Sequence, residues 1–94
     1  MLVAAALLGY CPMRTMQLNA AFGKVNVGDV ERDVIARMGR PHRVLDGCGY
    51  YGEPIAGCAR EYVYYPPWTI VDEAWVISLD ANGLVIHTAH FVSP

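Results

Sequence analysis

Residues 27–41 hold the start, the apolar face and the end of one short amphipathic helix, and this stretch constrains the fold more than any other. Asp29 is placed to cap the free N–H groups of the first turn. Gly39 follows the last turn, and Pro41 cannot continue a helix. Apolar residues recur between these ends at helical spacing, namely Val30, Val34 and Met38 with Ile35 beside them. This apolar stripe predicts a sheet for the helix to cover.

A weaker helix is expected upstream, over residues 12–24. Phe22 is its expected anchor into the core, and Gly23-Lys24 ends it. Its other apolar positions have mixed helical spacing: Met13, Met16 or Gln17, Ala20 and Ala21. Residues 25–28 make a tight link, so the two helices are expected to form a helical hairpin.

The remainder of the chain predicts strands. Residues 42–46 can form a short strand. Residues 60–65 are rich in aromatic and β-branched side chains and stop at Pro66-Pro67. Residues 74–79 alternate, so that one face, which we expect to be the core face, carries Trp75, Ile77 and Leu79.

The segment Asp80-Ala81-Asn82-Gly83 is a strong turn signal. Either Asn82-Gly83 forms a two-residue hairpin, or a type I turn precedes Gly83 in the left-handed region. Residues 84–92 then return as the partner strand. The expected fold is α+β, with two N-terminal helices on one face of a three- to four-stranded antiparallel sheet.

The N-terminus reads as a targeting segment. Residues 1–8 are unbroken apolar, which is too short for a membrane-spanning helix but suits the core of a secretory signal. Leu8-Gly9-Tyr10-Cys11 is similar to a bacterial lipoprotein signal, although Tyr10 replaces the usual small residue. We therefore expect residues 1–11 to be the signal, with Cys11 lipidated, and residues 12–94 to be one domain. A buried N-terminal helix remains the alternative.

Cys48 and Cys58 bracket a glycine-rich loop. Their separation fits neither a zinc knuckle nor a C-x-x-C redox pair. In an exported chain with Cys11 lipidated, the simplest use of the remaining two is a disulfide, worth about 2–3 kcal/mol for a loop of this size. Two reduced thiols in a cytosolic protein remain the alternative.

Four aromatic residues near that loop and near the proline break are too many for so small a core: Tyr50, Tyr51, Tyr65 and Trp68. Tyrosine and tryptophan form rigid, amphipathic contact surface, so we interpret the four as a protein-binding surface. Packing of these rings over a thin sheet is an equally open interpretation.

Other chemistry finds little support in the sequence. Seven Lys and Arg residues against nine Asp and Glu residues, scattered along the chain, argue against a nucleic-acid partner. His87 and His90 point to opposite faces of a strand and cannot share a metal ion. We expect no metal, no cofactor and no catalytic site. Solvation explains the acidic residues, which we place in loops and at strand ends: Asp46, Glu53, Glu61, Asp72, Glu73 and Asp80.

A set of positions from Phe22 to the C-terminus resembles the SmpA/OmlA (BamE-like) family of small outer-membrane lipoproteins. The positions that carry the resemblance are Gly28, Val34, Gly39, Pro41, Tyr62, Tyr64, Asp80 and Gly83. The resemblance implies a fold like one repeat of the β-lactamase inhibitor protein. It also implies a non-enzymatic periplasmic protein, anchored to the outer membrane by lipid, that contacts envelope proteins such as an outer-membrane assembly complex.

Two departures from this family matter. The family usually has Ser or Thr where this chain has Val30, so helix capping is expected from Asp29. The loop from Cys48 to Cys58 is not general to the family, so no specific partner carries over. A second function therefore stays open, in which a secreted inhibitor-like module docks on a periplasmic enzyme through this loop.

Overall fold

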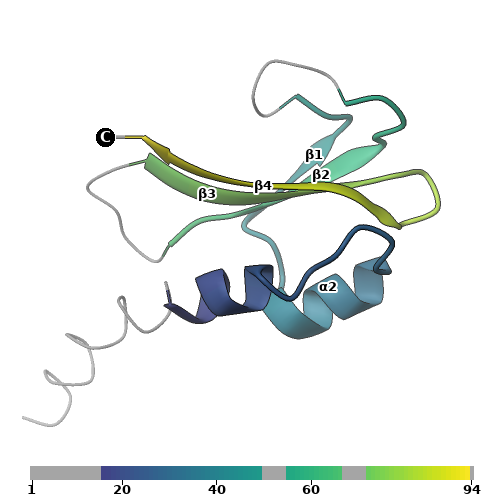
Figure 1. Cartoon of the computed structure of the whole chain (residues 1–94). Coiled ribbons are helices and arrows are strands. Elements are labelled where there is room, and N and C mark those ends of the chain that lie inside the picture. The colour runs from purple at the N-terminus through teal and green to yellow at the C-terminus, as the bar shows by residue number, and fades with distance from the viewer. Residues whose placement is uncertain (1–15, 50–54, 67–71, 94) are drawn as a thin grey trace, which may run out of the picture.

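The computed structural model describes residues 16–49, 55–66 and 72–93. A first helical segment lies at residues 16–22. It is followed in chain order by α2 (Glu31–Met38), β1 (Arg43–Asp46), β2 (Arg60–Tyr64), β3 (Asp72–Leu79) and β4 (Val85–Ser93). The four strands form one antiparallel sheet in the order β1-β2-β3-β4, and both helices lie against the same face (Figure 1). The expected α+β class, with the helices preceding the strands, is confirmed.

The main core lies between the helices and the sheet. Trp75, Ile77 and Leu79 are fully buried there, as their alternation in the sequence indicates. The buried residues they meet include Leu18, Val34, Met38, Tyr62, Tyr64 and Val85.

Two helix residues expected in the core are instead exposed. Val30 is 37% exposed, because its backbone is extended and precedes the first helical residue. Met16 is 70% exposed, and the fully buried residue of the first helical segment is Leu18. Leu18 lies one turn before Phe22, which packs partly against the same core.

The predicted cap at Asp29 is wrong. The N-cap residue is Val30, which makes no side-chain cap hydrogen bond. Oδ2 of Asp29 instead accepts the backbone N–H of Asn26 at 2.8 Å and pairs with Nη1 of Arg37 at 2.8 Å. The carboxylate therefore stabilises the link before α2 and ties it to the last turn of the helix.

The hairpin between β3 and β4 supplies the cap that the helix lacks. The backbone N–H of Glu31 donates to the carbonyl of Gly83 at 2.9 Å. Backbone hydrogen bonds also join Gly28 and Asp29 to Val85, at 2.8 and 2.9 Å. The start of α2 is therefore fixed by contact with the sheet rather than by its own sequence.

The C-terminal end of α2 follows the sequence. Gly39 has φ of 80°, and its N–H donates to the carbonyl of Ile35 at 2.8 Å. Its carbonyl accepts a hydrogen bond from the hydroxyl of buried Tyr64 at 2.7 Å. Strand β2 thus holds the last turn of the helix in place.

The turn from Asp80 to Gly83 has the second of the two predicted forms. Gly83 has φ of 79°, while every described residue with positive φ is a glycine. A two-residue type I′ hairpin would need positive φ at Asn82 as well, so it is excluded. Oδ1 of Asp80 accepts the N–H groups of Asn82 and Leu84, both at 2.9 Å, and closes the turn.

The centre of the second face of the sheet, on β2 and β3, is also buried, which the alternation pattern alone does not predict. Val63, Ala74 and Val76 form a separate apolar cluster, against which Leu45, Tyr65 and Phe91 pack. Two polar side chains, Glu61 and Ser78, are completely buried. This polar pair lies beside the cysteine loop.

Candidate functional site

The described ends of the loop between β1 and β2, residues 47–49 and 55–59, lie on the side of the sheet opposite the helices (Figure 1). Arg43–Asp46 pair with Arg60–Val63 in antiparallel register, and Gly47 continues the ladder by donating to the carbonyl of Ala59 at 2.8 Å. Counting two residues outward from the Asp46 and Arg60 pair reaches Cys48 and Cys58. The two cysteines are therefore directly opposite each other where the hairpin opens into the loop.

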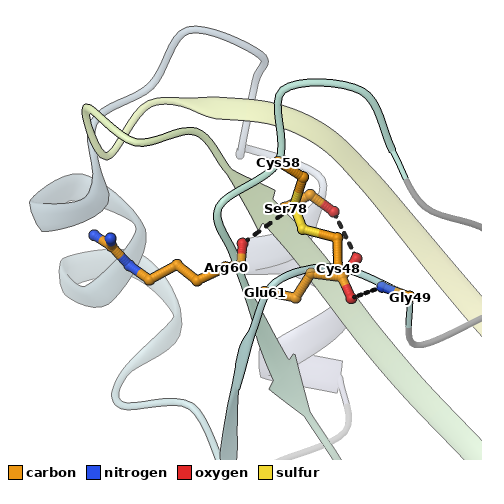
Figure 2. Close-up of a disulfide and its surroundings, with 6 residues drawn as sticks. All are labelled: Cys48, Gly49, Cys58, Arg60, Glu61 and Ser78. Carbon is orange, nitrogen blue, oxygen red and sulfur yellow. Dashed lines mark hydrogen bonds between the residues drawn. A yellow bond between two sulfur atoms is a disulfide. The ribbon is translucent and has the colours of Figure 1, made fainter.

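Cys48 and Cys58 lie at disulfide distance, with their Cα atoms 5.9 Å apart (Figure 2). This Cα separation falls within the range that protein disulfides adopt. The structure thus places the predicted pair as a staple across the base of the loop.

Glu61 lies directly beneath the staple, and its environment differs from the one predicted from the sequence. We expected a solvated carboxylate, but Glu61 is 0% exposed. Its Oε2 accepts the hydroxyl of Ser78 at 2.8 Å, and its Oε1 accepts the backbone N–H of Gly49 at 3.0 Å. A buried carboxylate is tolerated only when hydrogen bonds replace its hydration. The loop covers Glu61, and Glu61 in turn holds Gly49 in place.

The side chains of Arg60 and Glu61, the first two residues of β2, lie on opposite faces of the sheet. Figure 2 shows the side chain of Arg60 pointing away from the staple while Glu61 points toward it. Arg60 forms an ion pair with Glu31 of α2. Ser78 is the cross-strand neighbour of Glu61 on β3, which explains why their side chains meet. Ser78 is itself fully buried, and the hydrogen bond that its hydroxyl donates holds the carboxylate of Glu61 in position.

The predicted aromatic surface is only partly within the described residues. Tyr50, Tyr51 and Trp68 lie outside them, as does Cys11. Tyr65 follows the end of β2 remote from the staple. It packs against the second apolar cluster, and its backbone N–H donates to Nδ1 of His42 at 3.1 Å. The structure therefore does not bring Tyr65 together with the stapled loop.

The residues that carry the family resemblance are structural in this chain. Gly28, Gly39 and Gly83 make backbone contacts that join α2 to the sheet, and Val34 and Tyr64 are buried in the core. Pro41 and Tyr62 contribute to a groove between α2 and β1, whose other lining residues are Glu31, Ile35, Arg40 and Val44. Glu31 in this groove is already engaged by Arg60 and by the hydroxyl of Tyr62.

Three potential metal donors meet at the staple. The Sγ atoms of Cys48 and Cys58 and a carboxylate oxygen of Glu61 all lie within 4.8 Å of one another. Sequence spacing alone did not suggest this, because the third donor comes from β2. While Cys48 and Cys58 are paired in a disulfide, neither sulfur can bind a metal ion as a thiolate.

His87 and His90 lie on opposite faces of β4, as predicted. His90 stacks on Trp75 with ring centroids 4.9 Å apart, and its Nε2 lies 2.7 Å from a carboxylate oxygen of Glu73. The ring thus covers one edge of the core. His87 is the cross-strand neighbour of Ser78, on the other face of the sheet.

Comparison with known proteins gives no relative. The sequence matches no protein-family model, and no curated protein or solved structure is measurably similar to the chain. Among the helices of the described residues, none has the length and hydrophobicity required to cross a bilayer.

Proposed function

We propose that this chain is a small exported lipoprotein domain of the bacterial cell envelope that acts through protein–protein contacts in outer-membrane assembly or envelope maintenance. The observation that carries the proposal is the loop between β1 and β2, which is closed by the Cys48 and Cys58 pair and anchored from below by Glu61. Paired cysteines persist in oxidising compartments, which supports an exported location. The apolar segment that ends at Cys11 supports a lipid anchor.

A closed loop suits a binding role for an energetic reason. Residues 47–58 include four glycines, and ordering such a segment on binding would cost conformational entropy. The staple and the hydrogen bond from Gly49 to Glu61 remove part of that cost before a partner arrives. Tyr50 and Tyr51 are the loop residues best suited to anchor a partner, because aromatic side chains dominate the energetics of many interfaces.

The experiment that tests this role compares the loop tyrosines with an exposed residue elsewhere. Replacing both Tyr50 and Tyr51 by alanine should reduce partner retention in crosslinked envelope fractions by at least about 10-fold, as expected from the loss of anchors worth about 2 kcal/mol. Val92→Ala is the matched control, since Val92 is 60% exposed on β4. Equal retention by both variants, with equal melting temperatures, would remove the loop from the proposal.

The second candidate function is an inhibitor-like module that blocks a periplasmic enzyme with the same loop. The staple favours this candidate too, because a loop held in one conformation resembles the preorganised binding elements of inhibitors. Mass spectrometry of the mature protein separates the two functions. An acylated Cys11 at the N-terminus supports the lipoprotein, and a soluble mature chain cleaved without lipid supports the inhibitor.

A further inference from the structure

The donor cluster at the base of the loop has the composition of a metal site. Cys48, Cys58 and Glu61 offer two sulfurs and one carboxylate oxygen within 4.8 Å of one another. Thiolate and carboxylate are ligands that zinc accepts, at about 2.3 Å and 2.0–2.2 Å respectively. In a tetrahedral site those bond lengths place neighbouring ligand atoms roughly 3.5–3.8 Å apart. No two of the three donor atoms lie more than about 1 Å beyond this spacing, since none is more than 4.8 Å from another.

We propose that the reduced loop binds one zinc ion through Cys48, Cys58 and Glu61, with a fourth position left for water. The disulfide and the metal are then alternative ways of closing the same loop. A dithiol reductant supplies two electrons and two protons to break the S–S bond, and it becomes a disulfide itself. Zinc then displaces the two thiol protons and binds both thiolates.

The surroundings of Glu61 support its role as a ligand. Ser78 Oγ donates to Oε2 at 2.8 Å, and the N–H of Gly49 donates to Oε1 at 3.0 Å. Hydrogen bonds of this kind orient a metal-binding carboxylate. The burial of Glu61 and Ser78 excludes solvent from one side of the site.

The backbone geometry supports the two cysteines as a pair of ligands. They occupy directly opposed positions of the β1–β2 hairpin, with Cα atoms 5.9 Å apart. Figure 2 shows both side chains converging above Glu61 from the two limbs of the loop. The hairpin therefore holds the donors near one point even when no S–S bond joins them.

Cobalt is the appropriate first probe, because tetrahedral Co²⁺ with thiolate ligands absorbs visibly and zinc displaces it. The full chain carrying Cys11→Ser, so that only two thiols remain, is reduced with a dithiol under anaerobic conditions, desalted and titrated with Co²⁺. We expect one equivalent to bind with a thiolate-to-cobalt charge-transfer band, and one equivalent of Zn²⁺ to abolish it. The oxidised chain should show no such band.

Two variants and one control test the third ligand. Glu61→Gln keeps a hydrogen-bond acceptor for Ser78 but should weaken zinc binding at least about 10-fold, and Ser78→Ala should weaken it by about 10-fold. Glu73→Gln, whose carboxylate contacts His90 elsewhere on the sheet, should bind as the parent chain does.

The outcomes that overturn the proposal are specific. Equal cobalt spectra for the oxidised and reduced chains, no stoichiometric binding by the reduced chain, or an unchanged affinity in Glu61→Gln would each refute it. Circular dichroism monitors folding throughout. A variant that is unfolded without metal but folds with one equivalent still supports the site, whereas one that neither folds nor binds leaves the decision to Ser78→Ala, the smaller change.

Discussion

Removing the staple is the perturbation whose size can be worked out from the structure. The cysteines are ten residues apart, and loop-closure entropy for a ring of this size is worth about 2.7 kcal/mol at 25 °C. For a domain of this length, such a loss lowers the melting temperature by roughly 10–20 °C. The variant is the double substitution Cys48→Ser and Cys58→Ser, which keeps small polar side chains at both positions.

Urea unfolding, followed by tryptophan fluorescence with a chelator present, is the assay. We expect a lower midpoint for the double variant, and an equal or slightly steeper dependence of the unfolding free energy on urea, because its unfolded chain is less constrained. Reducing the parent chain with a dithiol should produce the same loss. A difference below about 0.5 kcal/mol between the oxidised chain and the variant would show that the staple does not constrain the unfolded chain as proposed.

The hydrogen bonds of Glu61 beneath the staple allow the unfolding experiment to test whether the staple and Glu61 act together. Ser78→Ala removes a donor from the buried carboxylate of Glu61, which also holds Gly49 in the loop. The serine substitutions at the cysteines and Ser78→Ala should therefore be coupled by about 0.5–3 kcal/mol, because they act on one connected network. Tyr64→Phe, on the opposite face of the sheet, is the control, and its effect should add to that of the cysteine substitutions.

Further substitutions test the contacts between α2 and the sheet. Tyr64→Phe removes the hydrogen bond to the carbonyl of Gly39 and should cost about 1–3 kcal/mol of unfolding free energy, measured by urea titration. Gly83→Ala should cost about 1–2 kcal/mol, measured by thermal melting, because Gly83 has φ of 79° and an added Cβ would lie 3.3 Å from a carboxylate oxygen of Glu31. Val92→Ala should change either measurement by less than about 0.5 kcal/mol, since Val92 is exposed; a larger change would show that this side chain contributes to the fold.

The features predicted correctly from the sequence are those with local causes. The end of α2 and the turn before β4 each require a residue with positive φ, a backbone conformation that residues other than glycine rarely adopt. Gly39 and Gly83 occupy these two positions. The alternation of Trp75, Ile77 and Leu79 identifies the core face because strand side chains point to opposite sides.

The features that were missed depend on residues distant in the sequence. Asp29 has the right position for a helix cap, but its carboxylate forms closer contacts with Asn26 and Arg37. Glu61 is predicted from the sequence to be a solvated strand-end residue. Its burial instead follows from the residues of the cysteine loop that cover it and from the strand register that places Ser78 opposite. One signal was available: extending the register of β1 and β2 by two residues makes Cys48 and Cys58 direct neighbours across the hairpin.

The dependence of α2 on the Gly83 carbonyl has a consequence for the order in which the protein folds. A helix of eight residues is too short to persist alone in water, and the amide of Glu31 finds its acceptor only after the distant hairpin has formed. The helix and the hairpin therefore belong to one cooperative unit, in which opening of the turn exposes the start of the helix. Hydrogen exchange at the amide of Glu31 should consequently follow the exchange of the β3–β4 ladder, not that of the neighbouring helical segment at residues 16–22.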